Sequence, residues 1–171
     1  MNVKNSKYYV AYGSNLHKEQ MSFRCPGAKV IAIGKVKDYK LVYRGSKTGA
    51  YATIIPSHGD YVPVAIWEIN ADHERRLDLY EGYPTFYYKK NISVVLENGK
   101  TIEAMVYIMF DEALVGRPSM AYLETCAQGY LDCGLDMVKF EESIVNNFEE
   151  LGLKVWPTSK VIAKNYLKKS R

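Results

Sequence analysis

Two short motifs in this chain hold residues that could do chemistry without a metal or an organic cofactor. The first follows an apolar and aromatic run beginning at Lys7, and it consists of Tyr12, Gly13, Ser14, Asn15 and Leu16. Gly, Ser and Asn favour a tight turn, and a helix that starts just beyond such a turn orients several backbone N–H groups outward. These groups suit a carboxylate or a developing oxyanion. An ordinary strand-to-helix connection has the same composition, so the loop alone leaves both interpretations open.

Glu81 forms the second motif, at the end of a predicted helix and directly before Gly82. A carboxylate at this position faces the negative end of the helix dipole, which raises its affinity for a proton. A raised pKa suits a general base that works near neutral pH. From the local sequence alone, a solvated surface acid is the simpler interpretation of Glu81.

Other reactive side chains lack the partners that their chemistry needs. Ser14 does not lie in a G-x-S-x-G motif, and no His and Asp follow it in an arrangement that indicates a triad. The spacing of the three histidines does not suit a metal, so we expect them to be solvated or locally hydrogen-bonded; they are His17, His58 and His73. Three cysteines without a C-x-x-C pair argue against a disulfide framework and a structural zinc site; they are Cys25, Cys126 and Cys133.

Length, charge and composition restrict the class of protein. A chain of 171 residues suits one domain with one core. The net charge of +4 is concentrated near the two ends without a basic stripe between them, so nucleic acid is not expected as a partner. No run approaches the roughly 20 apolar residues of a membrane helix, and no secretory segment follows the start. We therefore expect a cytoplasmic protein without a membrane partner.

Strands are predicted for the first two thirds of the chain, with helices inserted among them and further helices after them. The first predicted strand ends near Tyr12, two more lie on either side of Lys37-Asp38 within 28–44, and others cover 51–55, 61–69, 86–96 and 101–110. The predicted helices cover 17–24, 71–80, 119–133 and 136–148. Asn98-Gly99 between two alternating apolar runs is the strongest signal, because this pair is typical of a tight hairpin.

This order of elements indicates an α+β fold, which we expect to be a small mixed β-barrel with flanking helices. A Rossmann fold is disfavoured, because no G-x-G-x-x-G motif follows the first strand and the strands do not alternate regularly with helices. Residues 1–150 are expected to form one domain. Residues 151–171, with their basic end, are expected to be an extension that packs on this domain or at an interface.

Taken together, the motifs resemble those of the γ-glutamylcyclotransferase family. The resemblance rests on the Tyr12 to Leu16 loop, on Glu81-Gly82 after a helix, on Tyr88, and on the strand Val106 to Met109. It covers about residues 8–135. It implies a mixed β-barrel with a cavity at its mouth, where the loop binds a γ-glutamyl group through its backbone.

The same resemblance implies roles for single side chains. Glu81 would be the acid and base of the reaction, and Tyr88 and Tyr107 would line the pocket. In a γ-glutamyl compound the α-amino group can attack the γ-carbonyl and close a five-membered lactam, so neither an enzyme nucleophile nor a cofactor is required. The expected partner is a small γ-glutamyl substrate, and the expected products are 5-oxoproline and an amine or amino acid. A homodimer is open as well, since the extension could build a subunit interface.

Two other functions remain open at this point. A domain that binds a small acidic metabolite in the same pocket, without turnover, would have the same fold. A serine hydrolase that uses Ser14 would need a base that the sequence does not supply. The leaving group is open too, because loops that the sequence does not place would build that side of the pocket.

Overall fold

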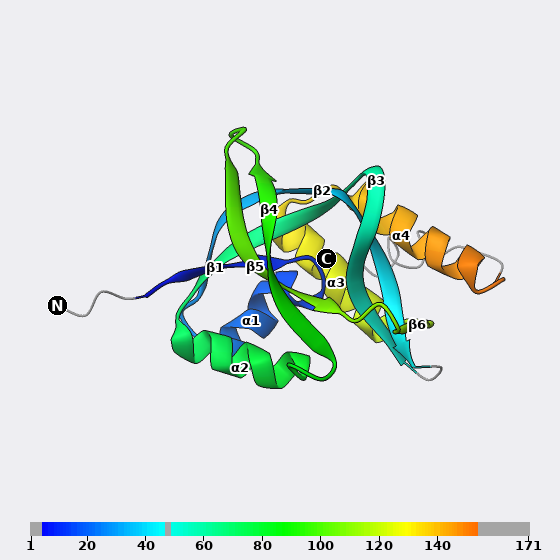
Figure 1. Ribbon diagram of the computed structural model, residues 1–171, viewed down its shortest axis with the longest axis horizontal. Coiled ribbons are helices and arrows are strands. Elements are labelled where there is room, and N and C mark those ends of the chain that lie inside the picture. The colour runs from blue at the N-terminus through cyan, green and yellow to red at the C-terminus, as the bar shows by residue number, and fades with distance from the viewer. Residues whose placement is uncertain (1–4, 47–48, 154–171) are drawn as a thin grey trace, which may run out of the picture.

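The computed structural model describes residues 5–46 and 49–153, and Figure 1 shows a strongly bent sheet with helices packed around it. The strands are β1 (Lys7–Ala11), β2 (Lys29–Ser46), β3 (Gly49–Ile69), β4 (Tyr87–Leu96), β5 (Thr101–Met109) and β6 (Leu114–Val115). The helices are α1 (Lys18–Arg24), α2 (Ala71–Glu81), α3 (Met120–Cys133) and α4 (Met137–Glu150), together with the 3-10 turn η1 (Ser14–Leu16).

The strands β1 to β5 close into a barrel. Their order is β3-β1-β5-β4-β2, and β2 pairs with β3 again, which joins the two edges. β1 and β5 are parallel, whereas the other barrel pairs are antiparallel. The predicted α+β fold, a small mixed β-barrel with flanking helices, is therefore confirmed.

Apolar side chains from the barrel strands form the core. Val10, Ile66 and Val106 come from three adjacent strands, and each is at most 1% exposed. Burying a side chain of this size stabilises a fold by about 1.5 to 3 kcal/mol. The core thus fixes the end of β1, from which the first predicted motif continues.

The predicted breaks at Lys37-Asp38 and between 55 and 61 are wrong, because β2 and β3 are two long strands instead of four short ones, whereas the predicted break between 44 and 51 is confirmed. The strands contain 18 and 21 residues and pair along most of their length. The register shifts between Lys37 and Tyr39, where Asp38 has a φ of 60° and accepts a hydrogen bond from the Gly59 N–H. Between Lys37 and Tyr39, one residue of β2 and four residues of β3, 57–60, have no partner in the pair, which resumes on the other side of them. The turn-forming residues therefore produce an irregularity inside a continuous pair.

The other predicted elements are confirmed to within two residues at each end. The hairpin of β4 and β5 turns at Asn98-Gly99, where Gly99 has a φ of 82°. Asn70 caps α2 by accepting a hydrogen bond from the His73 N–H, and the His73 side chain bonds the Asn70 N–H in return. The tight turn predicted at Gly13, Ser14 and Asn15 is present as η1, whereas the short strand β6 was not predicted.

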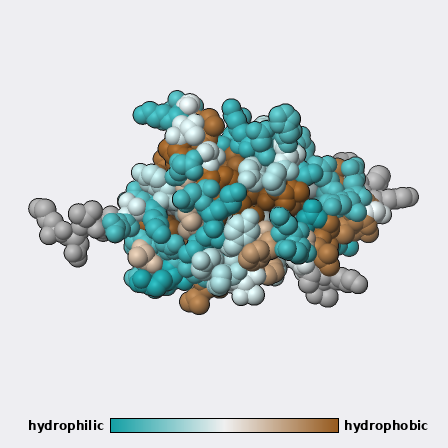
Figure 2. Space-filling view, viewed as in Figure 1, coloured by the Kyte–Doolittle hydropathy of each residue, from teal (hydrophilic) through white to brown (hydrophobic). Residues whose placement is uncertain are grey.

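The helices cover different parts of the barrel. α1 and α2 lie side by side below the barrel in Figure 1, α3 packs against η1, and α4 lies along β2. Figure 2 shows a mainly hydrophilic face, with apolar surface between the β4–β5 hairpin and β3. None of the helices in the described part of the chain is long and apolar enough to cross a membrane. The predicted extension lies mostly outside the described residues, which end at 153.

Candidate active site

The structure brings the two predicted motifs into direct contact. The Asn15 Nδ2 donates a hydrogen bond of 2.9 Å to Oε1 of Glu81, although the residues are 66 positions apart. β1 ends at Ala11 and leads into η1, which contains Asn15, while Glu81 is the last residue of α2. The end of a barrel strand and the end of a helix therefore build one site.

The loop that follows β1 leaves backbone donors available. The Leu16 N–H bonds the Gly13 carbonyl, and the His17 N–H bonds the Ser14 carbonyl, which turns the chain sharply. Among the residues that the structure describes, none accepts a hydrogen bond from the N–H groups of Gly13, Ser14 or Asn15. Three adjacent unpaired amides are suited to an anionic group.

Gly13 is favoured in this loop by limited space and not by a left-handed backbone. Its φ is −129°, which other residues also adopt. A Cβ at this position would lie 3.1 Å from Cβ of Ala52 and 3.3 Å from the Tyr122 hydroxyl. The close approach of β3 and α3 therefore leaves little room for a side chain, and these neighbours would have to move by a few tenths of an ångström to admit one.

Beside the loop lies a cavity of about 370 Å³. The predicted residues Tyr12, Gly13, Ser14, Asn15, Glu81 and Tyr107 all line it. The other lining residues are mainly aromatic; they are Tyr9, Tyr51, Ala52, Leu79, Tyr80, Gly82, Phe86, Tyr87 and Tyr122. The lining thus combines the polar groups of the 13–15 loop and Glu81 with many aromatic rings.

Two predicted binding residues do not line this cavity. Neighbouring residues of a strand point to opposite faces, so Tyr87 of β4 faces the cavity and Tyr88 does not. The Tyr88 ring lies against Phe110 instead, with ring centroids 5.0 Å apart. Leu16 is fully buried beneath the loop, where it supports η1. The predicted placement of Tyr88 in the lining is therefore corrected to Tyr87.

The environment of Glu81 differs from that of a solvated surface acid. Burial raises the pKa of its carboxyl group to about 7, and this effect outweighs the opposing effects of the Arg24 guanidinium and the Asn15 amide. We expected a raised pKa from the helix dipole, but loss of water is the dominant cause. A carboxyl group of this pKa can both accept and release a proton near neutral pH.

Tyrosine hydroxyls brace the walls of the cavity. Tyr12 donates to the Tyr107 carbonyl at 2.6 Å, and Tyr87 donates to the Ala52 carbonyl at 2.8 Å. The Tyr122 hydroxyl accepts a hydrogen bond from the Ala52 N–H at 2.9 Å. Burial raises the pKa of Tyr12 and of Tyr87, so these hydroxyls stay neutral beside Glu81.

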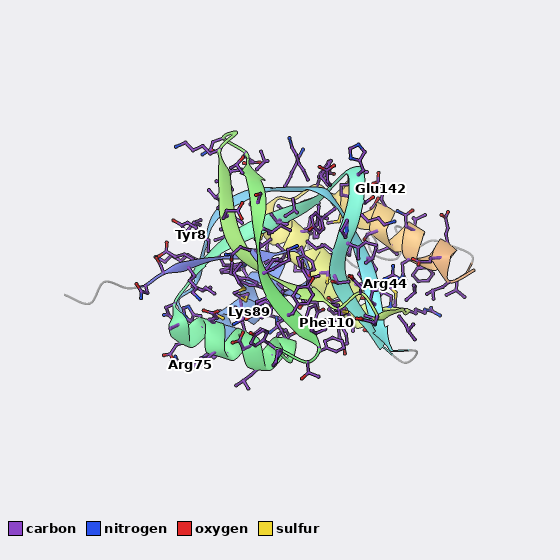
Figure 3. The ribbon with its side chains drawn as sticks, in the orientation of Figure 1. Tyr8, Arg44, Arg75, Lys89, Phe110 and Glu142 are labelled. Atoms are coloured by element: carbon purple, nitrogen blue, oxygen red, sulfur yellow. The ribbon has the colours of Figure 1, made fainter. Side chains whose placement is uncertain are left out.

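A row of acids on α2 holds this helix against the barrel. Glu74 and Asp78 precede Glu81 by about two turns and one turn, and the Lys89 ammonium lies 3.0 Å from the carboxylates of both. Asp78 also accepts a hydrogen bond of 2.6 Å from the Tyr107 hydroxyl. Figure 3 shows Lys89 between β4 and α2. These contacts fix the helix end that carries Glu81.

The histidines and cysteines lie away from the cavity. His17 caps α1, the His73 side chain bonds the N-cap residue of α2, and His58 is exposed next to Asp38. The three cysteines are free and buried. No group of three His, Cys, Asp or Glu side chains that could hold a metal ion occurs within the described residues.

One residue of the site was missed in the sequence. Arg24, the last residue of α1, donates a hydrogen bond of 2.7 Å to Oδ1 of Asn15. An arginine in a short helix is usually solvated, and only the fold brings α1 beside α2. No local pattern could have identified this contact.

Comparisons with known proteins agree with this geometry. The family model described as gamma-glutamyl cyclotransferase, AIG2-like, matches residues 9–124. A gamma-glutamylcyclotransferase from Homo sapiens is 31% identical over 149 residues, covering 82% of this chain and 78% of the relative. One from Bos taurus is 32% identical over 137 residues, covering 75% and 72%.

Solved structures resemble the fold over most of its length. A structure described as gamma-glutamyl cyclotransferase has a TM-score of 0.73 and 27% identity, and the match covers 94% of this chain and 99% of the other. A Homo sapiens protein described as uncharacterized has a TM-score of 0.72 and 31% identity, with 80% and 85% covered. The resemblance found in the two sequence motifs is thus confirmed, and the chain belongs to the γ-glutamyl cyclotransferase, AIG2-like family.

Proposed function

We propose that this chain cleaves a γ-glutamyl amide by cyclising its glutamyl part, releasing 5-oxoproline and an amine or amino acid. The observation that carries this proposal is the Glu81 carboxyl group, which has a pKa of about 7. It lines the same cavity as the 13–15 loop, whose backbone amides are free. A titratable acid beside anion-binding amides is what this cyclisation requires.

The reaction needs one proton carrier and a binding site for negative charge. The Glu81 carboxylate takes a proton from the substrate's α-ammonium group, and the freed amine attacks the γ-carbonyl carbon to form the new C–N bond. Glu81 then gives the proton to the leaving nitrogen as the old C–N bond breaks. The second proton that the attacking nitrogen must lose also passes to the released amine, which leaves as an ammonium ion, while the lactam keeps one N–H. The amides of Gly13, Ser14 and Asn15 bind the α-carboxylate or the oxyanion. Holding the chain folded supplies much of the rate, since intramolecular attack has a high effective concentration.

The substrate is a small molecule, and the aromatic side of the cavity contacts its leaving group. Tyr51, Phe86 and Tyr122 form this side, and the Tyr51 ring contacts the other two edge-on. We place the protein in the cytoplasm, because its free buried cysteines fit a reducing compartment. We also propose residues 1–150 as the catalytic domain and 151–171 as an extension, which the end of α4 at Glu150 supports.

A panel of γ-glutamyl compounds tests the proposed function. Purified protein is incubated with γ-glutamyl amino acids, γ-glutamyl-ε-lysine, a γ-glutamyl alkylamine and glutathione, and 5-oxoproline is measured. Release from at least one compound is expected. Thermal stabilisation by these compounds without any release would contradict turnover and support a noncatalytic metabolite-binding domain.

The pH dependence of the reaction is expected to reflect Glu81. Its base form must be present in the free enzyme, so kcat/KM should rise with pH and level off above a pKa of about 7. The measurement is the kcat/KM profile between pH 5 and 9 with the best substrate of the panel. An acid limb near 4.5, where an ordinary glutamate titrates, would contradict the buried environment of this group.

Replacing Ser14 by alanine is expected to preserve the reaction. The Ser14 hydroxyl lies 3.4 Å from that of Tyr80, and no histidine lies at the cavity. Losing one hydrogen bond costs about 1 kcal/mol, so the rate should stay within about tenfold of wild type. Ser22→Ala, in α1, is the control. A loss of several orders of magnitude for Ser14→Ala alone would support a serine nucleophile instead.

A further inference from the structure

The Arg24 guanidinium donates three hydrogen bonds to residues at or near the cavity. Its Nη1 donates to Oδ1 of Asn15 at 2.7 Å, and its Nη2 donates at 2.6 Å to the Tyr80 hydroxyl and to Oε1 of Gln20. The guanidinium carbon lies 3.7 Å from the centroid of the Tyr80 ring. Contacts from two helices therefore hold the guanidinium in one place.

These contacts determine the orientation of the Asn15 amide. A guanidinium can only donate hydrogen bonds, so the oxygen of the amide must face Arg24. The Nδ2 group then faces the other way and donates to Oε1 of Glu81 at 2.9 Å and to the Tyr9 hydroxyl at 2.8 Å. If the amide were flipped, its oxygen would face the Glu81 carboxylate, and two acceptors would oppose each other.

The orientation matters for proton transfer. Asn15 is 3% exposed, so no bulk water can replace a wrongly oriented amide group. Asn15 bonds only Oε1 of Glu81, and no other hydrogen bond to this carboxylate occurs within the described residues. The second oxygen, Oε2, is left to exchange a proton with the substrate.

We propose that Arg24 is a positioning residue for the cyclisation: it locks the Asn15 amide so that its NH2 group holds one oxygen of Glu81 and leaves the other free. This inference rests on the proposed function, in which Glu81 carries the proton. Arg24 does not line the cavity and acts through Asn15.

The groups around Glu81 predict the direction of the pH effect. Three tyrosines face Glu81: Tyr9 from β1, Tyr12 from the residue after β1, and Tyr87 from β4. Burial raises the pKa of each hydroxyl, so all three remain neutral. Tyr107 faces Glu81 from β5, and burial and the Asp78 hydrogen bond raise its pKa as well. Arg24 is the cation that lowers the pKa of Glu81, and the oriented Asn15 donor lowers it too. Loss of Arg24 should therefore move the acid limb of kcat/KM to higher pH.

The test is a double-mutant cycle on Arg24 and Asn15. We expect Arg24→Met and Asn15→Ala each to lower kcat by about 10- to 100-fold, measured at a pH above the acid limb of every variant. Because Arg24 acts through the amide, the double variant should lose no more than about threefold beyond Asn15→Ala alone. Losses that multiply, or a wild-type kcat for Arg24→Met, would overturn the proposal.

Further variants separate positioning from charge and from folding. Arg24→Lys keeps the positive charge but cannot reach Asn15, Gln20 and Tyr80 in the same geometry, so we expect kcat to fall with a smaller displacement of the acid limb. It also stands in for Arg24→Met if that variant does not fold. Arg75→Met is the control, because Arg75 lies on the outer side of α2 in Figure 3 and pairs with Asp72. Its kcat and pH profile should match wild type.

Glu81→Gln, measured in parallel, separates a failure of the proposed proton carrier from a failure of the role proposed for Arg24. If Glu81→Gln remains active, the proposed proton carrier is wrong. If Glu81→Gln is inactive while Arg24→Met has wild-type kcat, only the role of Arg24 is wrong.

Discussion

Replacing Glu81 by glutamine is expected to abolish 5-oxoproline release while leaving the chain folded. Glutamine keeps the size of the side chain and can still accept the hydrogen bond from Asn15, but it cannot take a proton from the substrate. General acid–base catalysis contributes about 10²- to 10⁴-fold, so kcat should fall at least by this amount. The measurement is 5-oxoproline release at pH 8, where most of the wild-type carboxyl groups are ionised.

The same variant should be more stable than wild type at that pH. The pKa of Glu81 is about 7 in the folded chain and about 4.5 in the unfolded chain, so its contribution to stability is present below pH 4.5 and is lost as the pH rises through 7. Above pH 7 the wild type carries a buried charge that glutamine lacks. The free energy of unfolding of Glu81→Gln should therefore exceed that of wild type by up to about 3 kcal/mol at pH 8.

The control is Glu97→Gln, at the turn of the β4–β5 hairpin and away from the cavity. It removes the same charge, and its activity should match wild type. Substantial turnover by Glu81→Gln would reject the assigned role. A fall in stability that persists at pH 8 would show that the carboxylate has a structural function.

Adding a methyl group at Gly129 should displace the 13–16 loop and lower activity, although Gly129 does not line the cavity. Gly129 lies in α3, and a Cβ there would be 2.5 Å from Cβ of Leu16 and 2.8 Å from the His17 nitrogen. Alanine in place of glycine stabilises a helix by about 1 kcal/mol, but overpacking lowers the free energy of unfolding by about 1 to 3 kcal/mol. Here the added methyl group would clash with backbone atoms, which cannot move as easily as a side chain. We therefore expect Gly129→Ala to be less stable and to lower kcat/KM by about tenfold or more, since a shift of about 1 Å can cost 100-fold.

Thermal unfolding and kinetics of Gly129→Ala should be measured beside those of Leu131→Ala. Leu131 lies on the exposed side of the same helix, half exposed to solvent, so its truncation should leave kcat/KM unchanged. A Gly129→Ala variant with wild-type kcat/KM would mean that the loop amides need no support from α3.

The sequence was informative where local chemistry determines the structure. Asn98-Gly99 predicted the hairpin, because few other residue pairs adopt the backbone conformation of such a tight turn. Asn70 and Gly82 predicted the two ends of α2. The motif at residues 12–16 and Glu81 were found as one set only through the family resemblance. Their contact joins elements whose packing no local pattern describes.

The remaining features depend on long-range packing. Asp38 and the segment 56–60 have the composition of turns, yet pairing on both sides carries β2 and β3 through them. Tyr87 and Tyr88 are identical in type, so only the register of β4 decides which one faces the cavity. The role of Arg24 requires α1 and α2 to pack together, which the sequence of neither helix indicates.

The central claim is that the bound glutamyl group cyclises onto itself, without attack of water on its carbonyl. Turnover of the best γ-glutamyl substrate in water enriched in ¹⁸O tests this directly, with mass spectrometry of the acid product. The account predicts 5-oxoproline without ¹⁸O, formed in equal amount to the released amine. Glutamate carrying one ¹⁸O would instead show hydrolysis and would contradict the account.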